Sequence, residues 1–77
     1  MSHDVNLLHQ GQEQKLVYMA NQIAKFFAHE PEEQAVAAIE THIRKYWAPR
    51  MRAKIIAHLA AGGDGLLPRA HAAIGRL

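Results

Sequence analysis

Three prolines divide this chain into segments whose apolar residues have helical spacing. Pro31, Pro49 and Pro68 each stand at or just before the start of such a segment. Proline fits the first position of a helix, where its missing N–H would have no partner, and it disfavours helical geometry at the residue before it. The pattern therefore predicts helices that turn corners at the prolines. No stretch shows the alternation of β-branched and polar residues that is typical of a strand.

Apolar residues recur at three- and four-residue steps in each segment, which is the spacing of one helix face. The predicted core rows are Leu16, Ala20, Ile23, Ala24 and Phe27; Val36, Ile39, Ile43 and Tyr46; Met51, Ile55 and Leu59; and Leu67, Ala70, Ile74 and Leu77. Gly62 and Gly63 would end the third helix with a turn. We predict an all-α fold, a small bundle of three main helices plus a short C-terminal helix. Residues 1–10 are polar and aperiodic, so we expect a flexible N-terminal tail before a single helical domain over residues 11–77.

The short chain limits the size of the core. A domain of 77 residues buries only about 60% of the surface that its unfolded chain exposes. The chain has no cysteine, which excludes disulfides and thiolate metal sites. We therefore expect marginal stability that docking on a partner would raise. The start of the chain lacks signal-peptide features and no segment is long enough to span a bilayer, so we expect a cytoplasmic protein.

The sequence contains no pattern typical of an active site. The six histidines include no pair three or four residues apart, so no helix turn presents two imidazoles to one metal. Glu32 and Glu33 fit the first turn of a helix, where carboxylates favour the positive end of the dipole. The glycines of "AAGGDG" follow a helix and do not form a phosphate-binding loop. We predict no catalytic, cofactor-binding or metal-binding residue in this chain.

The stretch "RKYWAPRMRAK", residues 44–54, is the strongest candidate for a functional surface. It holds the only tryptophan and five basic residues without an acid. Trp, Arg and Met are enriched at protein interfaces, which favours a docking surface. Alternatively, Trp47 belongs to the core and the cations form a solvated face. A nucleic-acid-binding module is a further alternative, although the segment after Pro49 lacks the Asn, Gln, Ser and Thr side chains that help to read bases and phosphates.

Four stretches of the chain resemble a known family. "LVYMANQIAKFF", "EPEEQAVAAI", "HIRKYWAPRMRAKIIAHLAAGG" and "GLLPRAHAAI" are similar to the delta subunit of soluble NAD-dependent formate dehydrogenases that use molybdenum or tungsten. The resemblance covers residues 15–77 and is most specific in residues 19–23, in residues 44–52 and at the paired glycines 62 and 63. The family often has Asp where this chain has Ala48, which removes a possible N-cap at that position.

The resemblance implies a noncatalytic accessory subunit without a cofactor of its own. It implies as partners a catalytic alpha subunit with bis-molybdopterin guanine dinucleotide and iron–sulfur clusters, and beta and gamma subunits with flavin and further clusters that pass electrons to NAD. The delta subunit would dock on the alpha subunit and stabilise it or help it mature. Residues that match the family motif are therefore the predicted partner-binding residues: Met19, Asn21, Gln22, Phe26, Arg44, Lys45, Trp47, Pro49, Arg50, Met51 and Arg52.

Overall fold

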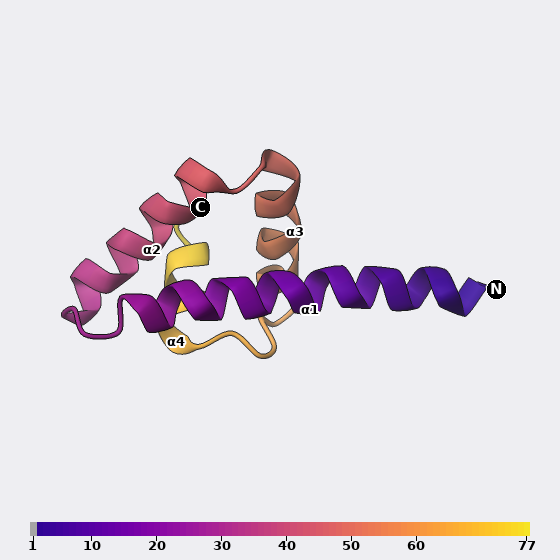
Figure 1. Ribbon diagram of the computed structural model, residues 1–77, viewed down its shortest axis with the longest axis horizontal. Helices are drawn as coiled ribbons and strands as arrows, with labels where there is room; N and C mark the ends of the chain where they lie inside the picture. The colour runs from indigo at the N-terminus through magenta and orange to yellow at the C-terminus, as the bar shows by residue number, and fades with distance from the viewer. Residues whose placement is uncertain (1) are drawn as a thin grey trace.

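The computed structural model describes residues 2–77, and it describes their side chains from Gln12 onward. The chain forms four helices: α1 (Ser2–Phe26), α2 (Glu32–Tyr46), α3 (Pro49–Ala60) and α4 (Pro68–Ile74) (Figure 1). Residues 2–77 contain no strand. The predicted all-α fold, with three main helices and a short fourth, is confirmed.

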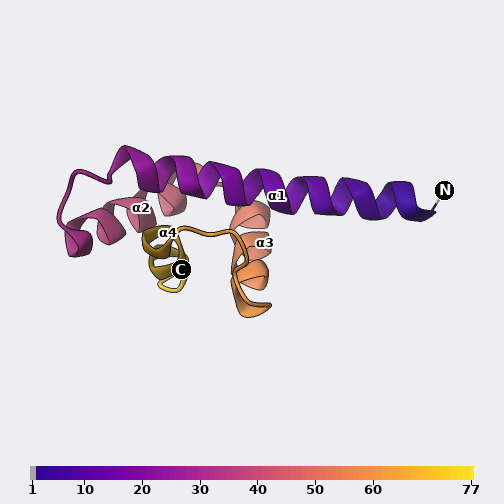
Figure 2. The ribbon, with the colours of Figure 1, turned by 90° about the horizontal axis from the view of Figure 1, so that it is seen from below.

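The long helix α1 lies across one side of the molecule, and α2, α3 and α4 pack against its second half (Figures 1 and 2). The molecule measures 46 × 21 × 19 Å, and α1 runs along the longest dimension. Helix α1 begins at Ser2, whereas the sequence analysis places the start of the helical domain at residue 11. The side chains of this first segment lie outside the described residues, and its flexibility stays a prediction.

Two of the three prolines occupy the helix position that the sequence predicts. Pro49 and Pro68 are the first residues of α3 and α4. The residues before them, Ala48 and Leu67, are extended with ψ angles of 150° and 151°, as the steric effect of a following proline requires. Pro31 instead precedes α2 as its N-cap residue. The corners between the helices are therefore set locally by the sequence.

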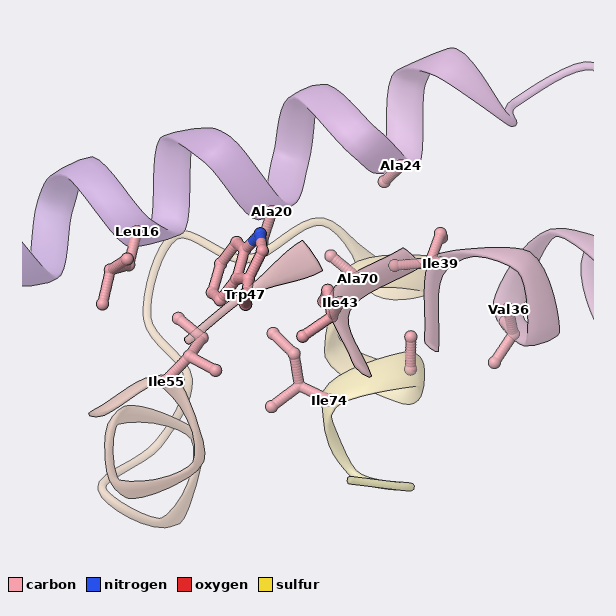
Figure 3. Close-up of a cluster of buried hydrophobic side chains, with 11 residues drawn as sticks. Leu16, Ala20, Ala24, Val36, Ile39, Ile43, Trp47, Ile55, Ala70 and Ile74 are labelled. Carbon is pink, nitrogen blue, oxygen red and sulfur yellow. The ribbon is translucent and has the colours of Figure 1, made fainter. Parts of the chain in front are cut away.

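The core lies where the four helices meet (Figure 3). Its largest fully buried side chains are Ile39, Ile43, Ile55 and Ile74. Trp47 joins them with only 5% of its surface exposed, and its ring lies between α1 and Ile55. Most of the predicted core rows are confirmed, and the choice between an interface and a core role for Trp47 is decided for the core.

The prediction of Tyr46 as a core residue is wrong. Tyr46 is 65% exposed, and its ring packs beside His42, with a distance of 4.7 Å between the ring centroids. Trp47 stands four residues after Ile43 and takes the next position of the buried row. The helix ends at Tyr46 and the chain turns extended at Trp47, with φ −84° and ψ 136°. This turn points the indole inward and leaves the tyrosine outside.

Candidate docking surface

The basic stretch at the corner between α2 and α3 separates into internal and outward-facing side chains. Arg52 is half-buried, and its Nη1 donates hydrogen bonds to the carbonyl oxygens of Trp47 at 2.6 Å and Arg44 at 3.3 Å. The last carbonyls of a helix have no partner within the helix and carry its negative dipole end. The Arg52 guanidinium therefore closes the C-terminus of α2 and fixes the corner.

Three further arginines also bind within the chain. Arg44 donates to the Glu40 carboxylate at 3.0 Å and to the Arg76 carbonyl oxygen at 2.7 Å. Arg76 pairs with Glu33 at 2.9 Å. The remaining contacts join Arg69 to the carbonyl oxygens of Ala28 at 3.3 Å and Glu30 at 2.8 Å. These arginines join α2 to the C-terminus and α4 to the loop between α1 and α2.

Asn21 has a structural role as well. Its Nδ2 donates to the Gly65 carbonyl oxygen at 2.9 Å, and its Oδ1 accepts the Leu67 N–H at 2.8 Å. The amide thereby binds the backbone at two positions of the loop between α3 and α4. The side chain holds this loop against α1 just before Pro68 opens α4.

Arg50 differs from the other four arginines of the chain. It is exposed and makes no hydrogen bond or ion pair with residues 12–77. Its side chain borders a groove of about 340 Å³ between the middle of α1 and the start of α3. The lining residues of this α1–α3 groove are Gln12, Lys15, Leu16, Met19, Arg50, Met51 and Lys54.

The α1–α3 groove combines apolar walls with positive charge. Leu16 is buried, and Met19 and Met51 are half-buried beside it. Three cationic side chains line the groove together with these apolar residues, and no carboxylate from residues 12–77 is among the lining residues. Lys54 donates a hydrogen bond to the Gln12 side chain, which fixes its ammonium group at the groove. The arrangement can accept an apolar group that carries negative charge at its edge.

One carboxylate, Glu13, occupies an adjacent hollow. Glu13 lines this hollow with Lys54 and Ala57, and its Oε2 lies 3.7 Å from Nδ1 of His58. The other ring nitrogen of His58 donates to the Asp64 carbonyl oxygen at 2.8 Å. Glu13 therefore lies beside His58 of α3 and is not among the lining residues of the α1–α3 groove.

Three of the predicted partner-binding residues, Met19, Arg50 and Met51, come together in the groove. Pro49 is exposed beside Arg50. Four others have internal roles as described above: Asn21, Arg44, Trp47 and Arg52. The remaining three, Gln22, Phe26 and Lys45, are exposed elsewhere. Partner binding by any of these residues stays a prediction.

Phe26 and Lys45 lie outside the α1–α3 groove. Phe26 is 72% exposed and forms a T-shaped pair with Phe27, with ring centroids 5.0 Å apart. Lys45 lies over the Tyr46 ring, with its Nζ 5.4 Å from the centroid. Phe27, Lys45 and Tyr46 line a second, more polar hollow of about 400 Å³ between the end of α1 and α2.

The groove is also lined by three residues that are not among the predicted partner-binding residues: Gln12, Lys15 and Lys54. A periodic signal was present, because Gln12, Lys15 and Met19 recur at three- and four-residue steps on one flank of α1. A single lysine on the flank of an amphipathic helix is common on solvated surfaces and does not by itself indicate a binding site. Only the crossing of α1 and α3 shows that Lys15 and Arg50 share one groove.

Residues 12–77 contain no group of three or more His, Asp or Glu side chains that could hold a metal ion. No helix within the described part of the chain is long and apolar enough to cross a membrane.

Comparison with known proteins identifies one family. The family described as the NADH-dependent formate dehydrogenase delta subunit, FdsD, matches residues 15–74 of the 77-residue chain. Curated proteins and solved structures gave no match. The matched segment contains all of α2, α3 and α4 and the second half of α1.

Proposed function

Since the chain belongs to the NADH-dependent formate dehydrogenase delta subunit family, we propose that it is a noncatalytic accessory subunit of such an enzyme. In this proposal it docks on the metal-containing alpha subunit and stabilises it or helps it mature. The beta and gamma subunits belong to the same cytoplasmic complex. The family match supports the assembly, and the features of the α1–α3 groove support docking.

The observation that carries the docking role is that Arg50, at an apolar groove, has no hydrogen-bond or ion-pair partner among residues 12–77. The other four arginines bind backbone carbonyls or carboxylates of the same chain, whereas Arg50 has no such partner in residues 12–77. Arginine beside methionine at a concave apolar surface is typical of the residues that dominate binding energy at interfaces. A partner that fills the groove would bury Met19 and Met51 and pair with Arg50.

The proposed subunit has no cofactor. The bis-molybdopterin guanine dinucleotide, the iron–sulfur clusters and the flavin that the family resemblance implies would be carried by the alpha, beta and gamma subunits. This chain would contribute by covering apolar surface of the alpha subunit and by ordering the segments that it contacts.

A nucleic-acid-binding module receives less support from the arrangement of charges. Arg44 and Arg52 bind within the chain, so the basic stretch offers fewer cations to phosphates than its composition predicts. Of the remaining cations of the stretch, Arg50 and Lys54 line an apolar groove, and Lys45 lies over the Tyr46 ring. Phosphate backbones are usually bound by basic, hydroxyl, amide and backbone N–H groups together.

Co-purification from the native host tests the proposed function. An affinity-tagged chain is isolated under nondenaturing conditions, and the eluate is analysed by mass spectrometry and for molybdenum and tungsten. We expect formate dehydrogenase subunits and one of the two metals in the eluate. An eluate without the alpha subunit, obtained from cells that make active formate dehydrogenase, would contradict the proposal.

A further inference from the structure

We infer that the α1–α3 groove receives a short amphipathic segment of the partner, in which a large apolar side chain is flanked by Asp or Glu. This inference rests on the proposed function, since it specifies the chemistry of the segment that the accessory subunit contacts. It is carried by three features of the groove: its apolar wall, its cationic rim and its length.

The wall of the groove favours binding of a large apolar side chain of the partner. Leu16, Met19 and Met51 supply its apolar surface from two different helices. Methionine is unbranched and polarisable, so two such residues can adjust around an inserted side chain. Burial of apolar surface supplies most of the free energy of association at such a site.

The rim of the groove favours carboxylates next to this apolar side chain of the partner. Lys15, Arg50 and Lys54 are lining residues, and no Asp or Glu of residues 12–77 lines the groove. Arg50 and Lys54 are four residues apart on α3, which places them on the same face of the helix. Lys54 is already oriented by its hydrogen bond to Gln12. A carboxylate at the rim would meet cations from both helices, whereas a cationic partner segment would be repelled.

The length of the groove is sufficient for a helical segment. Among residues 12–77, Gln12 and Met19 are the outermost lining residues on α1, and seven residue steps along a helix span about 10 Å. This length matches about two turns of a partner helix. Besides its three cations, the described lining of the groove offers apolar groups and the Gln12 amide, whose oxygen accepts a hydrogen bond from Lys54. It has none of the hydroxyl groups that help to bind phosphates. A protein segment therefore fits the groove better than a nucleic acid.

A site-directed crosslink identifies the segment in the assembled enzyme. The chain has no cysteine, so Met51→Cys carries a unique handle for a thiol-linked photo-crosslinker, and Gln12→Cys provides a second handle at the other side of the groove. Ala72→Cys is the matched control, because Ala72 is exposed on α4 and does not line the groove. Each labelled, tagged chain is assembled with formate dehydrogenase in the native host, purified and illuminated, and crosslinked peptides are sequenced.

We expect Met51→Cys and Gln12→Cys to label one and the same segment of another subunit, with Asp or Glu within one helical turn of a large apolar residue. The Ala72→Cys chain should not label that segment. The inference is overturned if the labelled segment has no carboxylate, if the label goes to nucleic acid, lipid or a second copy of the chain, or if the purified complex gives no crosslink from either groove position. If the tagged chain fails to bring down the alpha subunit before illumination, the proposed function itself fails.

Discussion

Two arginines that stand two residues apart at the α2–α3 corner have opposite roles. Successive residues of a helix are about 100° apart around its axis, so Arg50 and Arg52 project to nearly opposite sides of α3. Arg52 points back over the end of α2, where its guanidinium binds two carbonyl oxygens. Arg50 points to the groove beside α1. The composition of the stretch predicts a surface rich in arginine, but it cannot tell which arginine closes a helix end and which lines the groove.

Replacing each of these arginines by alanine separates the two roles. Arg52→Ala should lower the free energy of unfolding by about 1–3 kcal/mol, because charge-assisted hydrogen bonds to the Trp47 and Arg44 carbonyl oxygens are lost. Arg50→Ala should change it by less than about 0.5 kcal/mol, as exposed substitutions usually do. Urea denaturation followed by circular dichroism measures both. Equal losses of stability in the two variants would contradict these assignments.

Trp47 is a second residue whose role required the structure. An interface anchor and a core tryptophan have the same sequence signature in a short basic stretch, and only the extended turn after Tyr46 places the indole inside. Trp47→Ala should lower the free energy of unfolding by about 3–5 kcal/mol, as truncation of a buried aromatic does. For a domain of this size that loss should abolish the cooperative thermal transition. A folded Trp47→Ala chain with a nearly unchanged melting temperature would rule out the core role.

At the scale of elements, the helices and their corners could be predicted from the sequence, whereas the contacts between the helices could not. The apolar rows and the prolines predicted four helices and the helix starts at Pro49 and Pro68. These features are local, because proline geometry and helix periodicity need no tertiary contact. The α1–α3 groove depends on how two helices cross, and no local pattern contains that information. Lys15 is therefore identified as a lining residue only from the folded structure, where it borders the same groove as Arg50.

The turn between α3 and α4 is predicted to require glycine at position 63. Gly63 has a φ of 67°, and a Cβ at this position would lie 2.9 Å from the side chains of His71 and Leu59. Gly63→Ala should therefore lower the free energy of unfolding by more than about 1 kcal/mol. Gly75→Ala is the matched control, since Gly75 has helical geometry with a φ of −61° and its nearest atom would lie 3.4 Å away.

Thermal denaturation of the two glycine variants provides the comparison. The expected order of melting temperatures places Gly63→Ala clearly below the unmodified chain and Gly75→Ala close to it. A Gly63→Ala chain as stable as the Gly75→Ala control would show that the turn can relax, and it would contradict the prediction that the turn requires glycine at position 63.

At the scale of the whole molecule, the core is thin for the length of the chain. The largest fully buried side chains are four isoleucines, and the smallest members of the core are alanines. Apolar burial and conformational entropy nearly cancel in a chain of this size. We expect the isolated chain to be folded but only marginally stable, and we expect binding to the alpha subunit to raise its melting temperature, because a ligand that binds only the folded state stabilises it. A high melting temperature for the isolated monomer that the alpha subunit leaves unchanged would contradict this prediction.

The affinity of the isolated chain for the purified alpha subunit tests the docking role of the α1–α3 groove most directly. Isothermal titration calorimetry compares the unmodified chain with Arg50→Glu and with Lys25→Glu, a charge reversal of an exposed lysine on α1 that does not line the groove. Circular dichroism confirms that each variant is folded. Loss of a central interface contact costs about 2 kcal/mol or more, so we predict that Arg50→Glu raises the Kd at least about thirtyfold. Lys25→Glu should leave the Kd close to that of the unmodified chain. A folded Arg50→Glu chain that binds the alpha subunit as tightly as the unmodified chain would contradict the account.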